Sequence, residues 1–197
     1  SRLLYQSAQP CQLPPDLEAL AAPLPVKVHH AIQSPMLLGL RQPLILLPVV
    51  ALQQFSHSEL QHVLRHEHSH WQQGDLAGFY LQQWFGVVCW WSPCWRLLCN
   101  EWLRCRELRA DAQVLAALPD KTSQLHYAQT LLNCSAAVAA TVESDLVLRW
   151  QQQSLLAVRI QAVLSPLSPR HGALWLGALL GSVLLLLITV AVVSRQW

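Results

Sequence analysis

The sequence predicts a mainly α-helical, membrane-associated domain that contains a small β-hairpin or sheet edge and is followed by a transmembrane helix. Helical patterns with capping signals fill most of residues 56–165. Hydrophobic residues make up 53% of the 197 residues and charged residues only 12%, against about 25% charged in a typical soluble domain. The net charge of +2, without a basic run or a phosphate-binding glycine loop, argues against direct nucleic-acid binding.

The first part of the chain has little regular pattern. Residues 1–25 are rich in Pro, Ala and Leu, and we interpret them as a loop or linker from an upstream membrane segment. Two short β-prone runs follow, at Val26–Ile32 and Leu44–Leu47, with turn-forming residues between them. They could form a small hairpin or sheet edge, or one of them could pack as an extended loop.

Helices are expected after residue 55. Ser56 and Glu59 form a capping-box pattern at the start of the first helix, which ends near Gly74. Asp75 can cap a second helix over residues 76–91.

Three further helices are expected downstream. Ser92-Pro93 begins the first of them, because Pro is favoured in an opening helical turn, and this helix stops before Pro119. Thr122 can cap the next helix, and the last covers Leu146–Leu164.

The helix at residues 76–91 is apolar but too short for an ordinary membrane span. Tryptophan favours the membrane–water interface, and four tryptophans gather near the end of this helix: Trp84, Trp90, Trp91 and Trp95. The helix could lie against or dip into the bilayer. It could equally be a central helix of a soluble core, and the sequence favours neither.

Residues 173–193 carry no charge and are long enough to cross a bilayer, which takes about 20 apolar residues. We therefore predict a transmembrane helix there, in a chain that is part of a longer membrane protein with further transmembrane segments. Arg149, Arg159 and Arg170 precede the span and only Arg195 follows it. The positive-inside rule then puts the preceding domain in the cytoplasm.

The pattern His-Glu-x-x-His at residues 66–70 is the most informative feature. On a helix, His66 and His70 project from one face, and two imidazoles at this spacing can bind one zinc ion. Glu67 lies between them, where it can act as a general base on water. A catalytic zinc usually takes three protein ligands, so we expect Glu107 to be the third. Asp111, one turn later, would hydrogen-bond a ligand imidazole and fix its tautomer.

Each of these residues has a plainer interpretation. His66 and His70 could be surface histidines, and Glu107 and Asp111 could be ordinary salt-bridge partners of neighbouring arginines. Two motifs at a compatible distance on separate helices favour the zinc site instead. We expect His62 to be structural or solvent-facing, because a fourth protein ligand would close the site.

Four motifs together resemble the membrane metallopeptidases of the β-lactam sensor-transducer (antirepressor) family: His66-Glu67-x-x-His70, Gly74-Asp75-Leu76, Trp91-Ser92-Pro93 and Arg106-Glu107-x-x-x-Asp111. The resemblance covers residues 26–165, which we expect to be the metallopeptidase domain. It implies a zincin-like (gluzincin) fold and Zn2+ as the cofactor. It also implies a place on the cytoplasmic side of a bacterial inner membrane, in contact with lipid. No sensor domain is visible, so a β-lactam ligand is not implied.

The resemblance implies a metalloendopeptidase that cleaves a protein substrate, which could be a transcriptional repressor. A more distant resemblance is to the prenyl-protein and heat-shock membrane proteases, which would imply quality control instead. A zinc-binding signalling module without proteolysis and a structural metal site stay open as alternatives. Glu67 argues against the structural site, because such a site needs no general base.

A peptidase also needs a hydrogen-bond donor for the oxyanion that develops on the substrate carbonyl. Arg159, His126 and Tyr127 are candidates by their chemistry. Arg159 is favoured among them, because Arg159-Ile160 is similar to an Arg-Ile pair in the related membrane proteases. Its plainer interpretation is a surface arginine on a helix.

Overall fold

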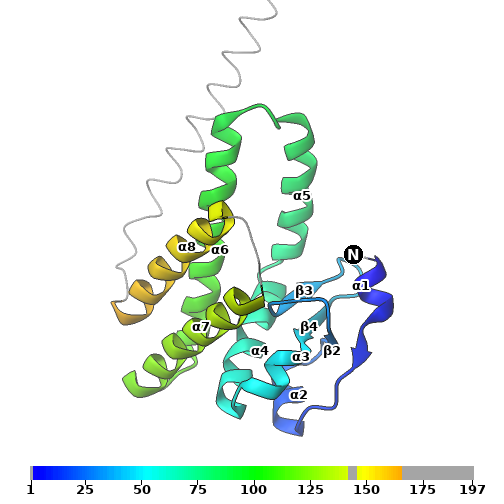
Figure 1. The fold of residues 1–197 in the computed structure, drawn as a ribbon, viewed down its shortest axis with the longest axis vertical. Coiled ribbons are helices and arrows are strands. Elements are labelled where there is room, and N and C mark those ends of the chain that lie inside the picture. The colour runs from blue at the N-terminus through cyan, green and yellow to red at the C-terminus, as the bar shows by residue number, and fades with distance from the viewer. Residues whose placement is uncertain (1, 142–145, 166–197) are drawn as a thin grey trace, which may run out of the picture.

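The computed structural model describes residues 2–141 and 146–165, which form a small sheet with helices packed on it and a second, wholly helical part (Figure 1). The elements run in the order α1 (Arg2–Ser7), β1 (Gln9–Pro10), α2 (Pro15–Ala21), β2 (Val26–His29), β3 (Met36–Leu38), β4 (Leu44–Pro48), α3 (Val49–Gln54), α4 (His57–Gln72), α5 (Asp75–Val88), α6 (Pro93–Ala116), α7 (Lys121–Thr141) and α8 (Leu146–Leu164).

The sheet has the strand order β1-β2-β4-β3. The two β-prone runs of the sequence become β2 and β4, but they pair in parallel, so they do not form a hairpin with each other. Parallel neighbours need a crossover connection, and the chain supplies it through β3, which pairs antiparallel with β4. The turn between β3 and β4 depends on Gly39, whose φ is +92° and whose missing Cβ leaves room for the backbone of Gln42.

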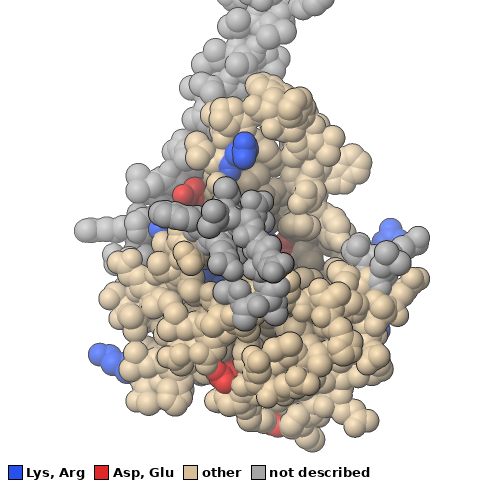
Figure 2. All heavy atoms as spheres, in the orientation of Figure 1, with Lys and Arg blue, Asp and Glu red and all other residues tan. Residues whose placement is uncertain are grey.

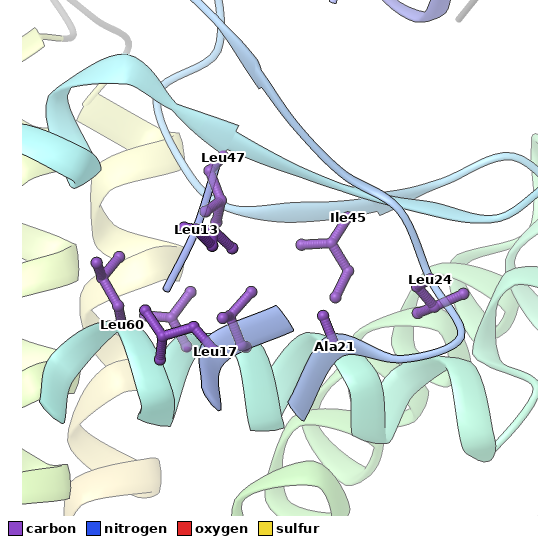
Figure 3. Packing of buried hydrophobic residues seen from close by; sticks show 9 residues of the cluster. Leu13, Leu17, Ala21, Leu24, Ile45, Leu47 and Leu60 are labelled. Atoms are coloured by element: carbon purple, nitrogen blue, oxygen red, sulfur yellow. The ribbon is translucent and has the colours of Figure 1, made fainter. Parts of the chain in front are cut away.

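Strand β4 is the centre of the hydrophobic core, and all of its residues are buried. Ile45 and Leu47 point from the sheet toward α4, and Leu17 and Leu60 fill the space below them (Figure 3). The alternate residues of β4 pack on the opposite face against α1 and Ile32. Burial on both faces explains why this strand is a continuous apolar run and not an alternating one.

The prediction that residues 1–25 are a loop or linker is wrong for residues 2–25, because they contain α1, β1 and α2 and belong to the domain. Leu17 and Ala21 of α2 are buried against α4, and β1 pairs with β2. Pro14 and Pro15 read as loop residues in the sequence, yet Pro is well suited to the first turn of a helix.

Most helix boundaries agree with the sequence prediction. The capping box of Ser56 and Glu59 opens α4, Ser92 caps α6, and α8 has the expected bounds. The side chain of Asp120 accepts hydrogen bonds from Ser123 at the start of α7, so Asp120 takes the capping role expected of Thr122.

Helix α5 and the first half of α6 form a hairpin that projects from the rest of the domain (Figure 1). Only Asp75 is buried among the residues of α5, so of the two alternatives left open for this helix, a central core helix is wrong. In residues 2–141 and 146–165, no helix is both long and apolar enough to cross a membrane. The span predicted at residues 173–193 lies outside the described residues.

Leu17→Ala is expected to lower the free energy of unfolding by about 2–5 kcal/mol, because it opens a cavity between the sheet and α4. Glu18→Gln, at the neighbouring exposed position, should change it by no more than about 0.5 kcal/mol. Denaturant titrations of the purified protein measure both. Equal midpoints for the two variants would mean that α2 is not part of the core.

Candidate metal centre

The candidate centre lies where α4 crosses α6. His66 and His70 are four residues apart on the buried face of α4, and Glu107 comes from α6. The two Nε2 atoms are 3.1 Å apart. Glu107 places its Oε2 3.3 Å from Nε2 of His66 and its Oε1 3.6 Å from Nε2 of His70.

This arrangement fits a single metal ion. One donor atom from each of His66, His70 and Glu107 lies within 4.8 Å of the others. Donors about 2.0–2.1 Å from a tetrahedral zinc are about 3.3 Å from one another, close to the separations found here. Two imidazoles and one carboxylate are also a ligand set typical of catalytic zinc.

The outward nitrogen of each imidazole faces a carboxylate. Nδ1 of His70 is 2.7 Å from Oδ2 of Asp75. Nδ1 of His66 lies 3.2 Å from Oδ1 of Asp111 and 3.1 Å from the hydroxyl of Tyr127, which donates to the same Asp111 oxygen. Carboxylates in these places hold the proton on Nδ1 and leave the Nε2 lone pairs free to bind a metal.

Sequence reasoning placed Asp111 beside a ligand imidazole but missed Asp75, which it assigned to a helix cap. Asp75 makes no capping hydrogen bond in the structure. It joins His70 to Arg109 of α6, which donates to its Oδ1 at 2.6 Å. The signal was present in the Gly74-Asp75 pair, because the left-handed Gly74 ends α4 and turns Asp75 back onto its last turn.

Arg159 of α8 reaches into the same centre. Its Nε and one terminal nitrogen donate to the two oxygens of Asp111, both at 2.7 Å. Its other terminal nitrogen lies 3.2 Å from Oε2 of Glu107. Its side chain is only 15% exposed, so the alternative of a surface arginine is wrong.

The charges of the centre are strongly coupled. Burial acts to raise the pKa of Asp111, but hydrogen bonds from His66 and Arg159 outweigh it and lower the pKa to about 2. Burial acts likewise on Glu107, and its contacts with His66 and Arg159 hold its pKa well below the usual range. Both carboxylates are therefore ionised at neutral pH and able to face a cation.

His62, one turn before His66, is buried and not solvent-facing. Its Nδ1 lies 2.9 Å from Oγ1 of Thr130. The hydroxyl of Thr130 donates its own hydrogen bond to the carbonyl oxygen of His126. Thr130 must therefore accept from Nδ1 of His62, which leaves Nε2 as a hydrogen-bond acceptor. Burial, followed by the charge of Arg65, lowers the pKa of His62, so its imidazole is neutral at pH 7.

A cleft of about 690 Å3 contains the centre. Edge strand β3 lines it together with α4, the base of the α5–α6 hairpin, α7 and α8. Glu67 is one of the lining residues, and no group in the described part of the chain is hydrogen-bonded to its carboxylate. Arg159 and Tyr127 also line the cleft. His126 does not, because its side chain is exposed elsewhere on α7.

Comparisons with known proteins identify related sequences. The family model described as BlaR1 peptidase M56 matches residues 14–163 of this chain. The methicillin resistance mecR1 proteins of Staphylococcus aureus and Staphylococcus epidermidis are 28% identical over 104 residues. The aligned segment is 53% of this chain and 18% of each relative, so the chain corresponds to a small part of those longer proteins.

Asp75→Asn is expected to weaken zinc binding by about 10–100-fold, because a neutral amide oxygen accepts the Nδ1 proton of His70 more weakly than a carboxylate does. Asp16→Asn is the matched control, since Asp16 makes the same kind of contact with His57 at an exposed site. Competition with a chromogenic chelator measures the affinities. The double variant His66→Ala/His70→Ala should retain no stoichiometric zinc, and unchanged affinity in Asp75→Asn would rule out this role for the carboxylate.

Proposed function

Since the chain belongs to the BlaR1-type M56 peptidase family, we propose that it is a zinc-dependent metalloendopeptidase that hydrolyses peptide bonds of a regulatory protein. One observation carries the proposal: His66, His70 and Glu107 converge in a cleft that Glu67 also lines. A structural site would need the three ligands but not a carboxylate beside them that has no hydrogen-bond partner among the described residues.

The residues divide the chemistry between them. His66, His70 and Glu107 would hold zinc, which supplies a Lewis acid for the substrate carbonyl and lowers the pKa of water to about 7. Glu67 accepts the proton as water attacks the peptide carbonyl and then passes it to the leaving amine. Asp75 and Asp111 fix the tautomers of the two imidazoles throughout.

Arg159 is the best candidate for the oxyanion donor. Its guanidinium lies at the cleft wall, and its two terminal nitrogens carry one N–H group more than their contacts with Asp111, Glu107 and Nε2 of His66 use. The Tyr127 hydroxyl already donates its hydrogen bond to Asp111, so we assign Tyr127 a positioning role. His126 is not proposed, because it is exposed outside the cleft.

The substrate is expected to bind as an extended peptide. Strand β3 is the last strand of the sheet order, and Met36, Leu37 and Leu38 line the cleft beside α4. In the described residues no strand pairs with the outer edge of β3, so its backbone can receive a peptide strand. This mode selects protein segments that are unfolded or locally extended.

We further propose that the enzyme acts in bacterial signal transduction from the cytoplasmic side of the inner membrane. Its substrate would be a transcriptional repressor or a segment of its own longer chain. Family membership and the uncharged run at residues 173–193 support this setting. The alternative is a zinc-binding signalling module that no longer cleaves.

Glu67→Gln is expected to keep bound zinc and to reduce cleavage by about 10²–10⁴-fold or more, because the amide keeps the size of the side chain but accepts no proton at neutral pH. Glu107→Gln should instead lower zinc affinity, because a charged ligand becomes neutral. Zinc content and cleavage of the protein itself or of a candidate repressor are measured in parallel.

Glu101→Gln, on the exposed side of α6, is the control and should change neither quantity. Wild-type cleavage by zinc-loaded Glu67→Gln would refute the peptidase mechanism. No cleavage by the wild-type protein with zinc bound, across full-length substrates, would favour the signalling module.

A further inference from the structure

The α5–α6 hairpin ends in an exposed apolar tip, which we define as residues 84–97. Trp84 and Trp90 are each 76% exposed and Val87 is 75% exposed. The other exposed large hydrophobic residues of the tip are Phe85, Val88, Trp91 and Leu97. From Leu76 to Trp95 the chain carries no charged side chain. An apolar surface of this extent marks an interaction site.

The two helices of the hairpin already pack against each other on their inner sides, so the exposed residues of the tip are not needed to hold the hairpin together. Gly78 of α5 faces the ring of Trp102 so closely that a Cβ would lie 2.6 Å from it. Higher up, the ring centroids of Phe85 and Trp95 are 5.8 Å apart. These contacts hold α5 against α6 and leave the tip residues facing outward.

We propose that the tip inserts into the interfacial region of a lipid bilayer and holds the cleft at the membrane surface. Tryptophan combines an apolar ring with a polar N–H, which suits the boundary between acyl chains and headgroups. The exposed Arg96 follows one turn after the start of α6, where its charge can meet anionic headgroups. In Figure 2 the visible surface over the upper part of the hairpin is mostly tan, with one basic group on it.

The length of the hairpin favours shallow insertion over a crossing. Helix α5 has 14 residues, which at 1.5 Å per residue amount to about 21 Å, against about 30 Å for the hydrocarbon core. Its lower end is also tied to the domain, because Asp75 is bonded to His70 and Arg109. Only the upper part of the hairpin is therefore free to enter lipid.

The sequence beyond α8 points to the same partner. The uncharged run begins at residue 173, nine residues after the end of α8 at Leu164. Nine residues reach at most about 30 Å. If residues 173–193 cross the membrane as the sequence predicts, the domain stays near the bilayer, and lipid is then a better occupant for the tip than a soluble protein.

Insertion would determine which bonds the cleft can receive. Leu76, Phe79 and Tyr80, at the base of the hairpin, line the cleft. With the tip in the interface, the side of the cleft formed by the base of the hairpin lies within about 21 Å of the headgroups. The scissile bond would then lie in a segment near the membrane and not in a distant soluble domain.

A spin label on the native, exposed Cys94 tests the proposal in the full chain with its other five cysteines replaced by alanine, reconstituted into vesicles of phosphatidylcholine and phosphatidylglycerol. Collisions with oxygen, which concentrates in lipid, are compared with collisions with a water-soluble nickel chelate. We expect the Cys94 label to lose nickel collisions and gain oxygen collisions on reconstitution. The control is Cys94→Ala/Leu125→Cys, because Leu125 is exposed on α7, and its label should stay accessible to nickel.

Two outcomes would overturn the proposal. A Cys94 label as accessible to nickel as the Leu125→Cys label would mean that the tip lies in water. Exclusion of both reagents together with spin–spin broadening would mean that a second copy covers the tip.

A charged tip provides an independent check. Val87→Glu/Val88→Glu should restore nickel collisions at Cys94, while zinc content stays at the wild-type level. With zinc content unchanged, the renewed access of nickel to the Cys94 label would come from loss of the lipid contact and not from loss of the fold. None of these measurements uses proteolysis, so their failure is distinct from failure of the peptidase proposal.

Discussion

The arrangement of the helices around the candidate site depends on the buried guanidinium of Arg159. Arg159 of α8 neutralises Asp111 and contacts Glu107, both on α6. Asp111 also accepts a hydrogen bond from the hydroxyl of Tyr127 on α7 and faces His66 on α4. Four helices thus meet through a single network of charges. Removal of one partner from such a buried network leaves an uncompensated charge, which typically costs about 3–5 kcal/mol. The same contacts that support the fold therefore fix the geometry of the candidate metal ligands.

Local signals in the sequence were sufficient for helices α4, α6 and α8, and they pointed to residues that the structure brings together at the candidate site. The capping box at Ser56 fixes the start of α4, and with it the face on which His66 and His70 lie. Ser92-Pro93 likewise fixes the start of α6 and the phase of Glu107 and Asp111. Short-range rules work for α4 and α6 because each begins at a capping serine that sets its register, and a spacing of four residues then places side chains on one face.

Features that depend on distant contacts were not accessible in the same way. The parallel pairing of β2 with β4 depends on a crossover through β3, and two apolar runs cannot specify its direction. Helix α2 is short, and it is stable because Leu17 and Ala21 are buried on α4. The burial of Arg159 could not be read from its neighbours either, since nothing local distinguishes an arginine that faces two carboxylates from one in water.

Asp75 gives the centre a mechanical property. It is the first residue of α5, and its two oxygens hold His70 of α4 and Arg109 of α6. Gly74 is the joint between α4 and α5. A tilt of α5 about this joint would pull directly on the imidazole of His70. One carboxylate thus links the base of the hairpin to a candidate metal ligand, so the position of α5 and the orientation of the His70 imidazole depend on each other.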